Sequence, residues 1–73
     1  MADTVSTSII EEIGETAGVV WRVLSDNGPL TLAKLLKKVD QPRDTVLEAL
    51  GWLAREDKIT ITEDRRNRVI ALR

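Results

Sequence analysis

The sequence contains no cysteine and no histidine, and its only aromatic residues are Trp21 and Trp52. The lack of cysteine excludes disulfides, thiolate nucleophiles and zinc sites built on thiolates. The lack of histidine removes the usual general base near neutral pH and the commonest metal ligand. We therefore expect a protein that is not an enzyme and that uses no metal and no cofactor.

Long apolar runs are also missing. No segment approaches the ~20 apolar residues that cross a bilayer, and residues 1–6 have neither the basic nor the apolar region of a secretion signal. A chain of 73 residues accommodates one domain with a modest core. We expect a domain over residues 9–73, a flexible polar tail over residues 1–8, no membrane contact, and a soluble protein in the cytoplasm.

The charges are unevenly distributed, although the formal net charge is only −1. Residues 1–28 hold five acidic side chains and one Arg, whereas residues 29–73 hold ten basic and seven acidic side chains. Such a separation is compatible with one face that meets phosphate groups. The signal is weak, because dedicated nucleic-acid-binding domains often have a pI above ~9, whereas the pI of this chain is 5.3.

The first helix is expected over residues 9–26. Ser8 and Glu11 have the spacing of a capping box, in which each side chain satisfies a backbone N–H group at the helix start. One apolar stripe at helical spacing follows, with Trp21 at its edge; its members are Ile10, Ile13, Ala17, Val20 and Leu24.

Glycines occur both at the end of this helix and in its interior. Gly28 suits the left-handed position that ends a helix, and Pro29 prevents the helix from continuing. Gly14 and Gly18 lie inside the helix, on the flank that carries Trp21. Because glycine costs a helix interior ~1 kcal/mol relative to alanine, this spacing suggests that something packs closely against them.

The middle of the chain predicts two more helices joined by a short turn. Leu30 is expected to point inward and to form a weak third strand beside the C-terminal hairpin. Thr31 can cap a helix over residues 32–39, and Pro42 suits the start of a helix over residues 42–56. Two helices joined in this way form a helix-turn-helix.

The last part of the chain changes from helical to alternating spacing. Residues 59–62 and 69–72 are typical of strands, and the polar segment from Glu63 to Arg68 is typical of a turn. A helix-turn-helix followed by a hairpin predicts an α+β winged helix-turn-helix domain. It should have three helices and a small antiparallel sheet, made of a two-stranded wing and a possible third strand near Leu30.

The core should combine the inward faces of the three helices with one side of the hairpin. Strand alternation places Val69 and Ala71 on the side opposite to Ile70 and Leu72. The predicted core residues are Ile10, Ile13, Ala17, Val20, Trp21, Leu24, Leu32, Leu35, Leu36, Val46, Leu50, Leu53, Ile59, Ile61, Ile70 and Leu72.

Two segments carry a resemblance to a known family. They are Ile13-Gly14-Glu15-Thr16-Ala17-Gly18 and Leu50-Gly51-Trp52-Leu53-Ala54-Arg55-Glu56-Asp57-Lys58-Ile59. From about Ile9 to Leu72 the chain resembles a family of short stand-alone bacterial winged helix-turn-helix proteins of unassigned function. The resemblance implies the winged-helix fold, and it implies DNA binding by analogy with larger winged-helix regulators.

In winged helices that bind DNA, the outer face of the third helix enters the major groove near its N-terminal end. In this chain that face holds Arg43, Asp44, Thr45, Glu48 and Ala49. Arg43 is suited to guanine, and Thr45 is suited to a phosphate or a thymine methyl group. Asp44 and Glu48 would repel phosphates, so a solvated helix face is an equally good interpretation.

The expected wing carries Arg65, Arg66 and Arg68 at the hairpin tip, where DNA phosphates or a minor groove can be met. Asn67 suits a turn position with positive φ. Charges at a hairpin tip also keep it soluble and prevent pairing of its edges, and two acidic neighbours partly cancel the arginines. For any one arginine we favour this second interpretation, and for the cluster we favour binding.

Lys34, Lys37 and Lys38 form a second basic group, on the helix that crosses the DNA backbone in this motif. Solvated surface lysines are the commoner explanation of such a group. Together with Arg43, Thr45 and the wing arginines, these lysines are the predicted contacts to duplex DNA. Binding through them would be weak and mostly electrostatic.

Trp52 departs most from the simple pattern. Its helical phase points away from the inward stripe of the third helix, so it either packs beneath the wing or forms an exposed contact. We favour packing, because large exposed aromatic side chains are uncommon on small monomers. Val19 and Val23 lie off the stripe of the first helix, and Val19 is either a dimer contact or a tolerated surface valine.

Two function classes remain open. The first is a DNA-binding, transcription-associated module that uses the third helix and the wing. The second is a protein–protein or homodimer module that uses Trp52, Val19 and Val23. Catalysis has no support, because the segment from Gly14 to Gly18 lies within a helical pattern and not after a strand, as a phosphate-binding loop would.

Overall fold

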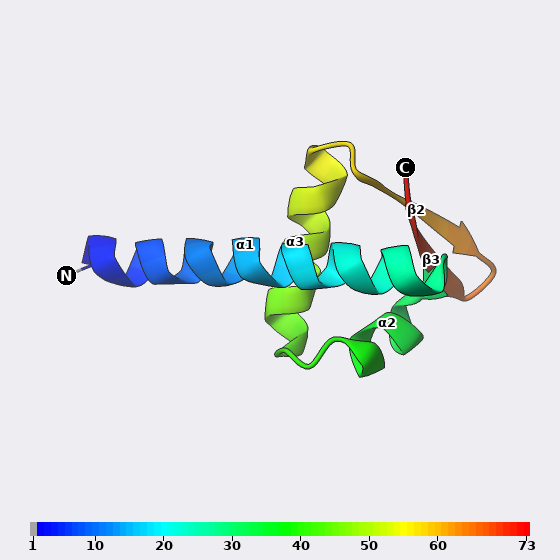
Figure 1. The fold of residues 1–73 in the computed structure, drawn as a ribbon, viewed down its shortest axis with the longest axis horizontal. Helices are drawn as coiled ribbons and strands as arrows, with labels where there is room; N and C mark the ends of the chain where they lie inside the picture. Colours follow the sequence, from blue (N-terminus) through cyan, green and yellow to red (C-terminus); the bar gives the residue numbers. More distant parts are fainter. Residues whose placement is uncertain (1) are drawn as a thin grey trace.

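The polypeptide forms three helices and a small sheet, in the order expected from its sequence (Figure 1). The computed structural model describes residues 2–73, and it describes side chains from Ser8 onward. The elements are α1 (Ala2–Asn27), β1 (Leu30–Thr31), α2 (Leu32–Lys38), α3 (Arg43–Arg55), β2 (Ile59–Asp64) and β3 (Asn67–Leu72). The predicted α+β winged helix-turn-helix fold is confirmed.

α1 begins earlier than predicted, at Ala2. Ser8 therefore lies within the helix and not at its N-cap, so the predicted capping box is wrong; residues 2–8 contain no Gly or Pro that would interrupt a helix. At the other end, Gly28 has a φ of 77° and donates its N–H to the Leu24 carbonyl at 2.8 Å, as predicted. The flexibility of residues 1–8 and the domain range 9–73 stay predictions.

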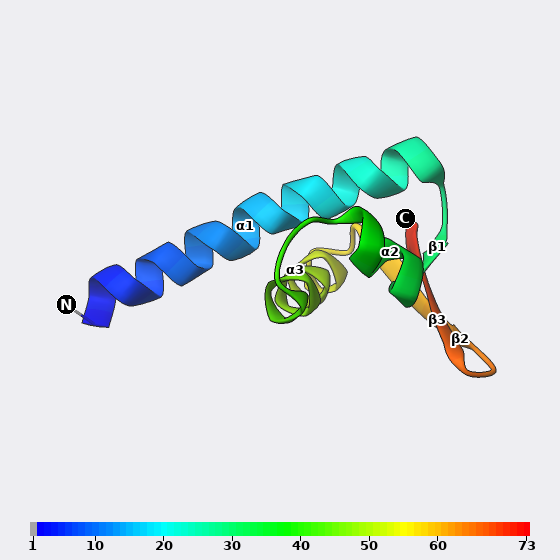
Figure 2. The same ribbon diagram turned by 90° about the horizontal axis from the view of Figure 1, so that it is seen from below.

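α1 also projects past the rest of the molecule. Its N-terminal half extends beyond α3 in both ribbon views (Figures 1 and 2), and the molecule measures 43 × 23 × 23 Å. None of the described helices combines the length and the hydrophobicity that a bilayer crossing requires. The cytoplasmic location stays a prediction.

The helix-turn-helix is built by local hydrogen bonds. Thr31 caps α2 as predicted, since the backbone N–H of Lys34 donates to its Oγ1 at 3.3 Å. Pro42 is the N-cap of α3, and its carbonyl accepts the N–H of Val46 at 3.0 Å. α2 and α3 thus start at the residues where the sequence places their caps.

The sheet has the strand order β1-β3-β2, and all its pairings are antiparallel. Leu30 pairs with Ile70, which confirms the weak third strand. The hairpin is longer than predicted, because Asp64 still pairs with Asn67. Its two-residue tip is Arg65-Arg66, and Arg65, not Asn67, takes the positive φ, at 62°.

The core lies where α1, α3 and the sheet meet. Its buried apolar residues are Ala17, Val20, Leu24, Leu35, Val39, Val46, Ala49, Leu50, Leu53, Ile59 and Ile70. Ala49 is fully buried, so its predicted place on the outer face of α3 is wrong. It follows Val46 by three residues and therefore shares the inward face.

Three residues of the predicted core are exposed instead: Ile10 (62%), Trp21 (46%) and Ile61 (43%). Ile10 lies on the projecting half of α1, and Ile61 lies on β2, an edge strand. Trp21 sits at the margin of the apolar stripe, where about half of its side chain stays exposed. The half-buried members of the predicted core are Ile13, Leu32, Leu36 and Leu72.

Candidate nucleic-acid interface

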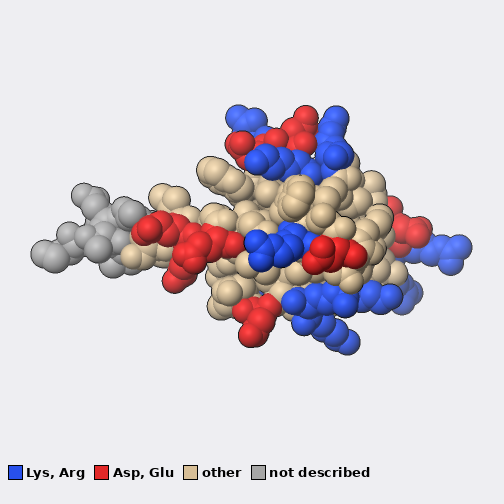
Figure 3. Space-filling view, viewed as in Figure 1, with Lys and Arg blue, Asp and Glu red and all other residues tan. Residues whose placement is uncertain are grey.

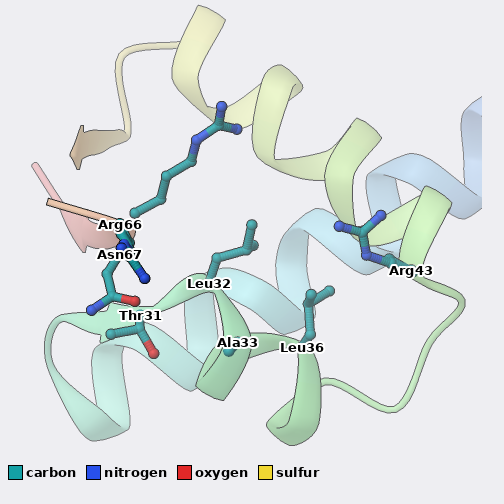
Figure 4. A pocket seen from close by; sticks show the side chains of 8 residues that line it. Thr31, Leu32, Ala33, Leu36, Arg43, Arg66 and Asn67 are labelled. Carbon is teal, nitrogen blue, oxygen red and sulfur yellow. The ribbon is translucent and has the colours of Figure 1, made fainter. Parts of the chain in front are cut away.

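A cleft of about 480 Å³ lies between α2, the start of α3 and the hairpin (Figure 4). Arg43 approaches it from α3, while Arg66 and Asn67 approach it from the hairpin, with Leu32 and Leu36 between them. We call this surface the basic cleft; its lining residues are Thr31, Leu32, Ala33, Leu36, Arg43, Arg66, Asn67 and Arg68. Three of the predicted DNA contacts therefore meet around one concave surface.

The start of α3 adds hydrogen-bond donors to this surface. Arg43 is the first residue of α3, and the N-cap Pro42 provides no side-chain hydrogen bond. The N–H groups of the first turn have no partner within a helix, and the helix dipole places partial positive charge there. The rim of the cleft at Arg43 can therefore accept an anion.

The three wing arginines differ in whether they form ion pairs. Arg68 lies opposite Glu63 in the hairpin, with its Nε 3.5 Å from Glu63 Oε1. Both side chains are mostly exposed, so this ion pair is weak. Arg65 and Arg66 form no ion pair among the described residues, and Arg65 occupies the turn without lining the cleft.

The remaining predicted contacts lie outside the cleft. Lys34, Lys37 and Lys38 are exposed on α2, and Lys37 and Lys38 complement the helix dipole in its last turn. Figure 3 shows basic side chains over α2 and at the end of the molecule that carries the hairpin. Thr45 is half-buried and does not line the cleft, so its role as a contact stays a prediction.

The outer face of α3 is acidic. Asp44 and Glu48 are exposed there, whereas Ala49 is buried in the core. Asp44 in the first turn complements the helix dipole, which gives it a structural role. Among the side chains that the structure describes, from Ser8 to Arg73, no three carboxylates come together in a way that could hold a metal ion.

A second concave surface lies between α1 and α3. This groove of about 340 Å³ is called the tryptophan groove below; its lining residues are Gly14, Ala17, Gly18, Trp21, Trp52, Leu53 and Lys58. Trp52 is 52% exposed, so the predicted packing of Trp52 beneath the wing is wrong. The reason is the side on which the hairpin lies: Ile61 and Arg68 share a cavity with Leu47 and Gly51 of α3, and Trp52 is absent from it.

Val19 and Val23, the other two predicted partner contacts, differ in exposure. Val19 is 39% exposed, whereas Val23 is half-buried and packs against the core. A Cβ atom built on Gly14 or Gly18 would meet nothing within 4 Å, so the close packing predicted there has no partner within the described chain. The sequence did not identify Trp21 as a surface residue, although its place at the stripe edge beside two glycines was a sign.

Comparisons with known proteins agree with this fold. Residues 7–72 match the family model described as winged helix-turn-helix domain (DUF2582). The chain is 42% identical over 65 residues to "Uncharacterized protein MJ1608" of Methanocaldococcus jannaschii, covering 85% of this chain and 91% of that one.

This relative is archaeal, so the similarity gives no support for a family restricted to bacteria. No solved structure matches the chain significantly. The family model spans nearly all of the sequence, from the exposed half of α1 to the end of β3. The chain therefore belongs to the family of winged helix-turn-helix domains described as DUF2582.

Proposed function

We propose that this protein is a non-enzymatic, transcription-associated module that binds the phosphate backbone of duplex DNA through its basic cleft. The observation that carries the proposal is the convergence of Arg43, Arg66 and Arg68 on one concave, solvent-open surface. These residues come from α3 and the wing, the two elements that winged helices use on DNA.

The chemistry of the cleft suits phosphate. A guanidinium group presents several N–H donors in a planar fork, which matches the oxygens of a phosphate. Arg66 has no ion pair among the described residues, so its charge is available to an anion. The uncapped first turn of α3 adds backbone donors beside Arg43.

The lysines of α2 extend the proposed contact. Lys34, Lys37 and Lys38 are exposed on the helix that crosses the DNA backbone in this motif. Asp44 and Glu48, in contrast, would lie near phosphates if α3 entered the major groove deeply. Binding should therefore depend mostly on charge and little on base sequence.

A second candidate function is a protein-contact module. It is favoured by the exposure of Trp21 and Trp52, which flank the tryptophan groove on α1 and α3. Half-exposed tryptophans in a groove are typical anchors for a protein partner. This function uses a different surface from the basic cleft, so the two candidates are compatible.

Fluorescence anisotropy with a generic labelled duplex at two salt concentrations tests the DNA proposal. The double variant Arg43→Gln, Arg66→Gln removes one phosphate contact from each side of the cleft. The slope of log affinity against log salt should fall by about 1.8, since each contact contributes about 0.9. The parent chain should bind more weakly at the higher salt concentration.

The matched control is Arg55→Gln, Arg73→Gln. It removes the same charge from the other end of α3 and from the end of the hairpin that lies opposite its tip. The control should leave the salt slope nearly unchanged. Equal losses in the two double variants would show only a general charge effect, and the cleft would then not be the DNA site.

A further inference from the structure

We propose that the tryptophan groove binds a second copy of this chain, with the α1 helices of the two copies packed antiparallel. The chain then forms a symmetric homodimer whose interface lies on α1 and on the C-terminal half of α3. This inference is independent of DNA binding, because it uses none of the residues of the basic cleft.

An apolar ridge on α1 is the first part of this interface. Ile10, Gly14, Gly18 and Trp21 follow one another at spacings of three or four residues, so they lie on one face of the helix. Ile10 is 62% exposed and Trp21 is 46% exposed. Apolar area of this kind on a small monomer marks an interaction site.

The groove beside the ridge is the second part. Trp52 and Leu53 of α3 form the wall that faces Gly14, Gly18 and Trp21. The space over both glycines is open, which allows another backbone to approach α1 closely. A helix can lie along the ridge of α1, and α1 itself projects from the molecule as such a helix (Figures 1 and 2).

The spacing of the ridge is self-complementary. A two-fold axis midway between Gly14 and Gly18 places Gly14 opposite Gly18 of the second copy. The same axis places Ile10 one residue from the level of Trp21 of the second copy, so an exposed aliphatic side chain lies beside an exposed indole. Each contact occurs twice, as an isologous interface requires.

The charges along the ridge identify a second copy of this chain as the partner. Glu11 and Glu15 border the ridge toward its N-terminal end, and Arg22, the only basic residue of α1, borders it toward the other end. Figure 3 shows acidic groups on the projecting half of α1 and a basic group farther along the helix. The same two-fold axis places Glu11 one residue from the level of Arg22 of the second copy, which the long arginine side chain can span. A parallel pair would place like charges together.

The exposed apolar side chains supply a large part of the area that a stable dimer needs. A tryptophan side chain contributes roughly 150–250 Å² when buried, so half-exposed Trp21 and Trp52 each leave on the order of 100 Å² to cover. Four such side chains in the dimer supply close to half of the ~1,000 Å² that a specific interface needs. The exposed Ile10 of each copy adds to this area.

Sedimentation equilibrium of the full chain tests the proposal, at concentrations from about 10 µM to about 1 mM. The parent should be a dimer in this range. Glu11→Arg alone and Arg22→Glu alone should each raise the dimer dissociation constant at least about tenfold, because each places like charges opposite one another. The double variant Glu11→Arg, Arg22→Glu should restore association.

The rescue is specific to an antiparallel dimer, because Glu11 and Arg22 are too far apart on one helix to interact within a single copy. The control Glu12→Arg changes the same charge on the opposite side of α1 and should leave the dimer intact. A parent chain that stays monomeric at the highest concentration overturns the proposal. Association that is unaffected by either single reversal overturns it as well.

Two glycine substitutions test whether the α1 helices of the two copies approach one another closely. Gly18→Gln and Gly51→Gln both add a side chain to an open helix position, so both folds should be retained, with helices favoured by up to ~1 kcal/mol. Only Gly18→Gln should abolish dimerisation, because only Gly18 lies on the ridge. Retained dimerisation in folded Gly18→Gln, as judged by circular dichroism and sedimentation, would exclude this interface.

Discussion

The basic cleft and the tryptophan groove lie on the same helix and differ in what solvent exposure costs them. Arg43 at the start of α3 borders the cleft, and Trp52 near its end borders the groove. An exposed guanidinium remains well hydrated and loses little without a ligand. An exposed indole leaves apolar area in water, at roughly 25 cal/mol per Å².

Because of this difference, the two surfaces give evidence of different strength for a binding partner. Surface arginines need no ligand to explain them, so the cleft argues for DNA only through the convergence of its side chains. The groove argues for a partner through its composition. Two half-exposed tryptophans leave apolar area in water, and two uncovered glycines weaken α1 without any contact in the monomer that explains them. The groove therefore carries the stronger sign of a missing contact.

Both surfaces depend on one core. α3 is held by Val46, Leu50 and Leu53, which are buried against α1 and the sheet. Leu53 also forms part of the groove wall. A change in this core should therefore affect the cleft and the groove together, whereas a change on either surface should affect that surface alone.

The largest expected effect follows from Leu53→Ala. Leu53 is 4% exposed, and truncation of buried leucines costs ~2–5 kcal/mol of unfolding free energy. In a domain of this size such a loss can prevent folding. Thermal or urea unfolding followed by circular dichroism measures it, with half-buried Leu47→Ala as the control that should lose clearly less. A melting curve like that of the parent would show that the inward face of α3 is misassigned.

The second effect concerns the cleft side alone. The triple variant Arg65→Ala, Arg66→Ala, Arg68→Ala removes two arginines of the basic cleft and Arg65 at the turn. Its salt slope on duplex DNA should fall by about 1.8 if the cleft alone makes contact, and by about 2.7 if Arg65 also meets a phosphate. Affinity near ~0.1 M salt should fall on the order of 100-fold. Folding and self-association should be unchanged, since these side chains lie at the hairpin tip and away from the tryptophan groove. Unchanged DNA binding would remove the wing from the proposed interface.

The fold could be predicted from the sequence because each element carries a local signal. The Thr31 cap, the Gly28-Pro29 helix end and the change to alternating spacing at Ile59 all depend on neighbouring residues. The core could be predicted for the same reason wherever a stripe faces a neighbouring element. The core prediction was wrong at Ile10, because periodicity does not show how far α1 projects past α3.

The sites were harder to predict because they depend on which elements meet. The arginines of the cleft could be named from the sequence, but their convergence depends on the approach of the hairpin to α2 and α3. The phase of Trp52 showed that it points away from the core stripe. It did not show that the hairpin lies on the other side of α3, against Leu47 and Gly51.

The third effect concerns the groove side alone. Trp52→Ala should lower the unfolding free energy of the monomer by about 1.5 kcal/mol, half the cost of a buried tryptophan, because half of the indole is already in water. It should also weaken self-association and leave the salt slope on DNA unchanged. Unfolding at a concentration where the chain is monomeric separates the two contributions. A loss of 3 kcal/mol or more would show that Trp52 is buried in solution.

The smallest expected effect distinguishes the shape of the wing from its charge. Arg65 has a φ of 62° at the first position of the two-residue turn between Asp64 and Asn67. A non-glycine residue there is strained by about 1–2 kcal/mol, whereas glycine adopts this φ freely and costs roughly 0.5–1 kcal/mol through the entropy of the unfolded chain. Arg65→Gly should therefore stabilise the fold by about 0.5 kcal/mol relative to Arg65→Ala.

Comparison of these two variants keeps the charge constant, because both remove the same guanidinium. The Gly variant should melt about 2–4 °C above the Ala variant, as expected for this energy in a domain of this size. Both lack the same guanidinium, so both should show the same salt slope on DNA. A Gly variant that melts below the Ala variant would show that the turn does not hold Arg65 in the left-handed region. DNA binding that differs between the two would show that the wing acts through its shape as well as its charge.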